Sequence, residues 1–285
     1  MAAINYVKRN DFLYVSLFYP RDGWQKLIKR AVIPFLDLSS ARYDMSYICH
    51  FSTFRGDAIH FTILVKEDKN DFVLFLHNYF QKYFNEHPSS FIRDQEEFDS
   101  VFMDFPPNSL QYGLHDFPFN GSSRFDLNML FVLQETSAIF LAALSKAGPA
   151  SDIITLALHI YSSISIYHQK FSEEHVPEPN GQTIDPQLQQ LLDIQYDENI
   201  ELIKQVMMNN YNIIYKKKLP GNQSWLNRWL ALNKRVAENK PSSSSDILKP
   251  SYPDFIAYSK KQLGLNQDEE VLIRYFVNKA FNQFI

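Results

Sequence analysis

Runs of β-branched and aromatic residues, bounded by turn-forming residues, predict strands in the first 120 residues of the chain. The expected strands are residues 12–19, 45–54, 58–65, 98–105 and 109–117. Between them, two stretches have apolar residues three and four positions apart, which is typical of a helix with one buried face. These helices are expected at residues 22–38, with Asp22 as the capping residue, and 70–85.

Beyond Gly121 the apolar spacing is that of helices. The predicted helices are residues 125–146, 151–171, 186–218, 252–263 and 267–284. The stretches 173–186, with three prolines, and 240–246, with four serines, are interpreted as loops. The predicted fold class is therefore α+β, a single domain over residues 1–285 in which a strand-rich part (1–121) packs with a mainly helical part (122–285).

The composition narrows the function classes. Hydrophobic residues make up 45% of the chain, with 24 Phe and 16 Tyr, which is enough to build a large core. The chain has 8 Gly, which is few for a fold that binds phosphate through glycine-rich loops, so such a fold is disfavoured. The net charge of −4 argues against nucleic-acid binding driven by bulk charge, so no nucleic-acid partner is predicted.

Cysteine usage and the first residues indicate a reducing compartment. Cys49 is the one cysteine of the sequence, so neither an intrachain disulfide nor a cysteine-based zinc site can form. Charges at Lys8, Arg9 and Asp11 interrupt any signal-like apolar run at the start. Since no stretch approaches the roughly 18 apolar residues of a membrane-spanning helix, a cytoplasmic protein without a membrane span is predicted.

The stretch FSTFRGDAIHFTILV, residues 51–65, brings Arg55, Asp57 and His60 together around a turn between two strands. One interpretation is a plain hairpin, in which arginine and aspartate form the turn and the histidine is a strand residue. The functional interpretation has His60 and Thr62 on the same strand face, lining a polar site, because alternate strand residues share a face. The sequence leaves both interpretations open.

Two other segments carry residues that are able to do chemistry. In QYGLHDFPFNG, Tyr112 and His115 could act as acid–base groups, although a solvated strand end would have the same pattern. On the last predicted helix, Arg274, Asn278 and Lys279 share one face, which is typical either of a binding face or of a solvated one.

The histidines do not predict a metal site. His159 and His168 lie nine residues apart on one predicted helix, which places them on opposite sides of it. His50 and His60 could oppose each other across the hairpin, but no nearby carboxylate accompanies them to complete a zinc site. Neither a metal nor any other cofactor is predicted.

Three segments, taken in order, resemble the thiopeptide-type bacteriocin biosynthesis domain, which is also the C-terminal elimination domain of class I lantibiotic dehydratases. STFRGDAIHFTILV is similar to the family pattern FIRYxDPxxHLRLRF, with His60 on the family histidine. YGLHDFPFNG (112–121) aligns with YEPEVERYGG without a gap, and LIRYFVNKAF (272–281) aligns with LIHMxxNRLF. The family domain is about as long as the whole chain, so the resemblance covers all of it.

The chain departs from the family at most of the charged positions. In the first segment, this chain has Thr62 and Leu64 where the family has two arginines. In the second, it has Gly113 and His115 in place of two acidic residues and Pro118 in place of an arginine. In the third, Arg274 replaces a histidine and Lys279 replaces an arginine. A further arginine position is Thr53, and Arg55 is displaced from it by two residues. Since cations stabilise developing negative charge, the loss of several arginines weakens elimination unless other cations replace them.

The resemblance implies that the chain modifies a ribosomally made peptide. The first activity it implies is the elimination of glutamate from glutamylated Ser or Thr, which yields dehydroamino acids, by one half of a split dehydratase. The residues implied for this chemistry are His60 or His115 as the base, Arg55 and Arg274 as cations, and Lys279 and Asn278 as substrate-binding residues.

Two alternatives remain open. Thiopeptide pyridine synthases share this domain, join two dehydroalanines by a formal [4+2] cycloaddition and eject a leader peptide. In that case Tyr112, His60 and His115 are the expected acid–base groups. The other alternative is a non-catalytic subunit that binds a peptide or a partner protein. The implied partners are a precursor peptide with its leader and, for elimination, a separate glutamylating subunit; a homodimer is compatible with either.

Overall fold

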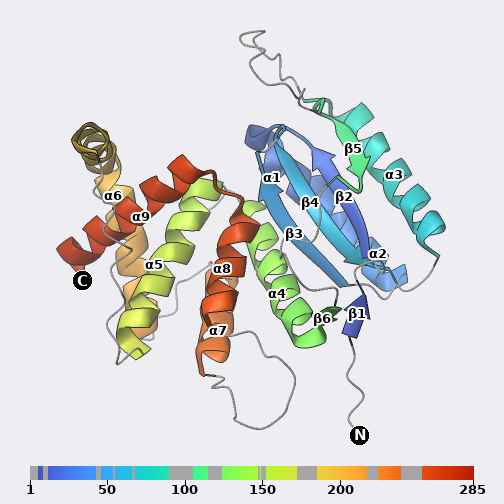
Figure 1. The fold of residues 1–285 in the computed structure, drawn as a ribbon. Coiled ribbons are helices and arrows are strands. Elements are labelled where there is room, and N and C mark those ends of the chain that lie inside the picture. Colours follow the sequence, from blue (N-terminus) through green and yellow to red (C-terminus); the bar gives the residue numbers. More distant parts are fainter. Residues whose placement is uncertain are drawn as a thin grey trace, which may run out of the picture.

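The computed structural model describes residues 6–8, 12–42, 46–53, 55–65, 68–89, 105–114, 124–146, 148, 152–171, 185–216, 224–238 and 252–285. The elements of the first part are β1 (Tyr6–Lys8), β2 (Phe12–Phe18), η2 (Arg21–Gly23), α1 (Trp24–Leu27), η3 (Ile28–Val32), α2 (Ile33–Arg42), β3 (Ser46–Ser52), β4 (Ala58–Leu64), α3 (Lys69–Glu86) and β5 (Ser109–Tyr112). Those of the second part are β6 (Arg124–Asp126), α4 (Leu127–Leu144), α5 (Ile153–Phe171), α6 (Pro186–Lys216), α7 (Ser224–Glu238), α8 (Tyr252–Leu263) and α9 (Gln267–Phe284). The predicted α+β class, with a strand-rich first part and a helical second part, is confirmed (Figure 1).

Four strands form an antiparallel sheet in the order β3-β4-β2-β5, and β1 pairs separately with β6. The central strand β2 pairs with β4 along its whole length. This register places Ser16 opposite His60, and His60 in turn opposite His50 on β3. Because directly opposed residues lie on the same face of a sheet, these three polar side chains form a row across it.

The other face of the sheet is covered by α1, η3, α2 and α3 (Figure 1). Apolar side chains of β2 and β4 meet apolar side chains of these helices there, and all of them are buried. The residues in this contact are Val15, Leu17, Phe61 and Ile63 from the sheet and Val32, Phe35, Leu36, Leu76 and Phe80 from the helices. Burying a side chain of this size stabilises the fold by roughly 1.5–3 kcal/mol, so this face belongs to the core.

Helices of the second part close the outer edge of β3. The backbone N–H of Cys49 donates to Ser137 Oγ of α4 at 2.8 Å. The side chain of Gln262, on α8, donates from Nε2 to the carbonyl oxygen of Cys49 at 3.0 Å and to Ser137 Oγ at 2.9 Å. All three residues are completely buried. Side chains from two helices therefore take the place of a further strand.

The helix predicted for residues 22–38 differs in detail from the observed structure. It consists of η2, α1, the π-helical η3 and α2 in succession, and it continues to Arg42. Asp22 makes no capping hydrogen bond, because the 3₁₀ turn η2 begins after Pro20. The wider π turn ends at Val32, two residues before Pro34, which has no N–H to donate to the turn before it.

Two predicted strands also differ. The strand expected at 109–117 ends at Tyr112, because the next residue, Gly113, has a φ of +71° and leaves the extended conformation. Residues 115–117 lie outside the described residues. So does the strand predicted for 98–105, apart from Phe105, which is not in a strand.

In the second part, the last two predicted helices are confirmed as α8 and α9. The helix expected at 125–146 begins at Leu127, because residues 124–126 form β6 and pair with β1. Helix α7 was not predicted from the sequence. Its apolar residues Trp225, Leu226, Trp229, Leu230 and Val236 are buried and have helical spacing, so the signal was present.

Gly264→Ala is expected to destabilise the protein more than Gly113→Ala. A Cβ atom at Gly264 would lie 1.8 Å from the carbonyl oxygen of Phe51, whereas one at Gly113 would meet nothing within 4 Å. Both glycines have a similar positive φ, so both substitutions cost about 1 kcal/mol of backbone strain. The first adds a steric cost of about 1–3 kcal/mol. Equal losses of unfolding free energy in chemical denaturation would contradict the close approach of the α8–α9 turn to β3.

His159 is expected to destabilise the fold on acidification. It is buried between α5 and α6, where its Nδ1 lies 3.4 Å from Asn210 Oδ1, and burial lowers its pKa from 6.5 to about 4. As the pH falls from 6.5 to 4, the unfolded chain binds a proton that the folded chain excludes, so the free energy of unfolding decreases, by roughly 3 kcal/mol in full. Denaturation at pH 7 and pH 4.5 should show a smaller pH dependence for His159→Gln than for the native protein. The same dependence in both would refute this assignment.

Candidate functional site

A row of polar side chains crosses one face of the sheet. From β3 to β5 it consists of His50, His60, Ser16 and Gln111, one from each strand and each opposite its neighbour. His60 and Ser16 are buried, at 7% and 0% exposure, whereas His50 and Gln111 at the two ends are half-buried. The row therefore runs from one accessible end to the other through a buried centre.

His60 is held at this centre by contacts on both sides. Its Nδ1 lies 2.8 Å from Ser16 Oγ, and its ring centroid lies 4.7 Å from that of His50. Its ring also meets that of Phe18 in a T-shaped arrangement, at 6.4 Å between centroids. An imidazole that is buried and hydrogen-bonded in this way has a fixed orientation, which is a requirement of an acid–base group.

Arg55 lies at one end of the same region, in the turn between β3 and β4, with a φ of +59°. Its carbonyl oxygen accepts the backbone N–H of Phe105 at 3.0 Å, and its guanidinium carbon lies 4.6 Å from the centroid of the Phe105 ring. Phe105 in turn packs on Phe18 at 4.8 Å, and Phe18 meets the ring of His60. Two aromatic rings thus connect Arg55 with His60.

Tyr112 lies on the opposite face of the sheet from His60. It is paired with Val15, the neighbour of Ser16, and successive strand residues point to opposite faces. Its hydroxyl is 3.4 Å from Nδ1 of His77 on α3, and burial raises its pKa to about 12. The structure therefore does not bring these two predicted groups together. The third, His115, lies outside the described residues.

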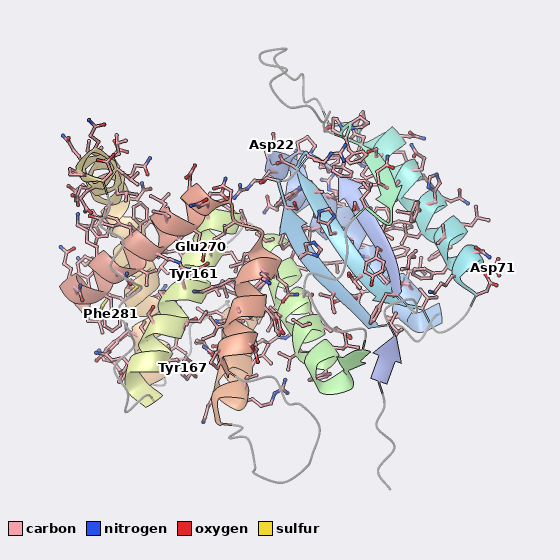
Figure 2. The ribbon with its side chains drawn as sticks, in the orientation of Figure 1. Asp22, Asp71, Tyr161, Tyr167, Glu270 and Phe281 are labelled. Carbon is pink, nitrogen blue, oxygen red and sulfur yellow. The ribbon has the colours of Figure 1, made fainter. Side chains whose placement is uncertain are left out.

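The predicted residues of α9 lie away from the row, against other helices. Arg274 donates to Glu270 Oε1 from Nε at 3.1 Å and from Nη2 at 2.5 Å. The same oxygen accepts the hydroxyl of Tyr161 on α5 at 3.2 Å, and Figure 2 shows Tyr161 and Glu270 side by side. The guanidinium of Arg274 is thus bound to a carboxylate of its own helix.

Lys279 is bound to a carboxylate of another helix. Its Nζ donates to Asp193 on α6, which also accepts the hydroxyl of Tyr275 at 2.5 Å. These donors, Lys279 first, lower the pKa of Asp193 to about 2, so the pair is charged at neutral pH. Asn278, beside Lys279, is exposed. In this structure the cation on Lys279 connects α9 with α6.

Thr62 lies on the same sheet face as His60, and the sequence predicted no catalytic role for it. It lies two positions beyond His60 on β4, between Tyr14 and Ile48 of the neighbouring strands. It is completely buried, and its hydroxyl has no hydrogen-bond partner among the described residues. A buried hydroxyl without a partner is energetically costly, and such groups are found where a ligand supplies the missing partner.

The described residues also bear on two predicted absences. Among them, no group of three or more His, Cys, Asp or Glu side chains is arranged to hold a metal ion. Within the same ranges, no helix is both long and apolar enough to cross a membrane.

Comparison with protein-family models gives no match, and neither does comparison with curated proteins. Solved structures do match. The pyridine synthase TbtD from thiomuracin biosynthesis is 14% identical, with 96% of this chain and 98% of that chain covered and a TM-score of 0.61. TsrL is 12% identical, with 95% of this chain and 94% of that chain covered and a TM-score of 0.52. The tRNA-dependent lantibiotic dehydratase MibB from Microbispora sp. 107891 is 13% identical, with 99% of this chain and 29% of that chain covered and a TM-score of 0.42.

The likeness to TbtD and TsrL extends along nearly the full length of all three chains. At 14% and 12% identity it is a likeness of fold. The resemblance inferred from the three sequence segments is thus confirmed at the level of the fold.

Thr62→Val is expected to stabilise the protein by about 1 kcal/mol, because it replaces a buried, unpartnered hydroxyl with a methyl group of similar size. Chemical denaturation of the two proteins measures the difference. The comparison substitution Ser16→Ala removes a hydroxyl that is paired with His60 without adding volume, and it should destabilise. A loss of stability in Thr62→Val of more than about 1 kcal/mol would show that the threonine hydroxyl has a partner.

Proposed function

We propose that this chain is an enzyme that cyclises a dehydrated, ribosomally made peptide, as a pyridine synthase does, with His60 as its acid–base group. The observation that carries the proposal is the row on the sheet face, in which the buried His60 is hydrogen-bonded to Ser16 and lies between Ser16 and His50. The fold shared with TbtD along both chains supports it.

The chemistry of a [4+2] cycloaddition suits such a row. Two dehydroalanines form a six-membered ring without net oxidation, and the ring becomes aromatic when water and the leader peptide leave. The amide of one partner must first pass a proton from nitrogen to oxygen, which one histidine can mediate. The remaining requirement is that two peptide segments are held in contact. Neither step needs a cluster of cations.

Glutamate elimination is the second candidate, and Arg55 is the observation that favours it. Its guanidinium lies at the Phe105 end of the site, where it could hold a leaving carboxylate while His60 removes the α-proton. Arg274 and Lys279 support this activity less, because each is bound to a carboxylate of the protein itself. A separate glutamylating subunit is a partner only in this second case.

The proposal is tested with a precursor peptide from the same gene neighbourhood, prepared in a dehydrated form and in a glutamylated form. Mass spectrometry should show that the native chain releases the leader from the dehydrated peptide. We expect His60→Gln to lower the rate by about 10²–10⁴-fold, as for loss of an acid–base group. Tyr112→Phe is the matched control and should leave the rate within about twofold, because its hydroxyl lies on the covered face against His77.

Other outcomes reassign the function. Loss of glutamate from the glutamylated peptide, abolished by Arg55→Gln, would establish the second candidate instead. Binding of both peptides with no change in mass would overturn the enzymatic proposal and indicate a non-catalytic peptide-binding subunit. Full activity of His60→Gln on either peptide would remove His60 from the site.

A further inference from the structure

We infer that Ser16 is a positioning residue for His60: its hydroxyl oxygen accepts the Nδ1–H of the imidazole, so that Nε2 is the nitrogen that exchanges a proton with the bound peptide. This inference rests on the proposed function and identifies a residue that the three sequence segments do not contain. The contact that supports it is the 2.8 Å distance between Ser16 Oγ and His60 Nδ1, with both residues buried.

The position of the serine oxygen is fixed by the sheet. Ser16 lies on the central strand β2, opposite His60 of β4 on one side and Gln111 of β5 on the other. A residue paired on both sides cannot shift along its strand without breaking both registers. With an exposure of 0%, the hydroxyl is shielded from bulk water. The distance to His60 is therefore set by the pairing of three strands.

Serine is an unexpected residue at this place on packing grounds alone. Central strands favour β-branched and aromatic side chains, and β2 has them on either side in Val15, Leu17 and Phe18. A buried hydroxyl is costly unless it is hydrogen-bonded, and His60 supplies that partner. Ser16 and His60 thus satisfy each other's hydrogen bond. If the pair had a purely structural role, two apolar residues at these positions would stabilise the sheet more.

The orientation of the pair has a chemical consequence. A neutral imidazole has one N–H and one basic nitrogen, and the hydrogen bond made by one nitrogen sets which form the other takes. When Nδ1–H donates to Ser16, Nε2 is basic. Among the described residues, a second titratable group that contacts this ring is His50, whose centroid lies 4.7 Å away on β3. Phe18 meets the ring in a T-shaped arrangement. In the proposed orientation, the contact between Ser16 Oγ and Nδ1 selects the tautomer.

The test uses the full-length chain with Ser16→Ala and Ser16→Cys. Alanine removes the hydroxyl, whereas cysteine keeps the shape of the side chain but replaces the oxygen with a larger sulfur that hydrogen-bonds weakly. A loss shared by both variants therefore reports the hydrogen bond. Thr62→Val, which removes another hydroxyl of the same face, is the matched control for the ring shifts. Nitrogen-15 chemical shifts of the His60 ring report its tautomer directly and need no peptide. Steady-state rates on the dehydrated peptide report kcat and KM.

In the native chain we expect the Nδ1–H tautomer, and in both Ser16 variants a mixture of tautomers. The kcat should fall by at least about tenfold in both variants, with KM within about twofold, because the reacting group and not the peptide contact is altered. Thr62→Val should keep the native tautomer. An Nε2–H tautomer in the native chain, or an unchanged ring and unchanged kcat in Ser16→Cys, would overturn the inference.

The two readouts keep this inference distinct from the proposed function. If the native chain leaves every peptide unchanged, the proposed function fails, whatever the ring shifts show. If the peptide is cyclised and His60→Gln is inactive, but neither Ser16 variant changes the tautomer, the function stands and the positioning role fails.

Discussion

The backbone of Cys49 is the point on which the arrangement of the two parts depends. A strand at the edge of a sheet has N–H and C=O groups without partners, and such groups cannot be buried unsatisfied. Here the N–H of Cys49 donates to the hydroxyl of Ser137 on α4, and the carbonyl oxygen of Cys49 accepts a hydrogen bond from Gln262 on α8. Since Gln262 also donates to Ser137, the two helices and the strand are joined at one place. The neighbouring residue His50 is thereby fixed beside His60.

Arg274 and Lys279 are paired with carboxylates of the helices, while polar residues of the sheet face form the candidate site. Arg274 and Lys279 occupy a segment that resembles a family motif, yet their partners are Glu270 and Asp193. The order of the segments along the chain is similar to that of the family, and the fold is shared with TbtD and TsrL. The side-chain chemistry at those positions is different, and the function proposed above accordingly relies on positioning and proton transfer and not on anion binding.

Local signals in the sequence were sufficient for much of the fold. The start of α9 was predictable because Asn266 and Glu269 form a reciprocal cap, and its separation from α8 because Gly264 ends that helix. The shared face of His60 and Thr62 follows from strand alternation alone. Helix α7 was detectable by the same reasoning but was not predicted, and the π turn before Pro34 has no comparable pattern signal.

What the sequence could not provide is pairing between distant residues. Whether Tyr112 faces His60 depends on the register of β5 on β2, and a shift by one residue would reverse its side. Ser16 becomes significant only when β2 is placed beside β4, 44 residues away in sequence. The partner of Lys279 lies 86 residues earlier in the chain. Such contacts arise from the packing of the whole molecule and have no local signature.

The closure of β3 by α8 also has a consequence for biosynthesis. The residues that meet there, Cys49 and Gln262, are 213 positions apart. At typical rates of synthesis of 5–20 residues per second, roughly 10 to 40 s pass between their emergence from a ribosome. During that interval the edge of the nascent sheet lacks its final covering, and exposed edge strands readily pair with other chains. A chaperone that shields nascent strands should therefore raise the yield of correctly folded protein.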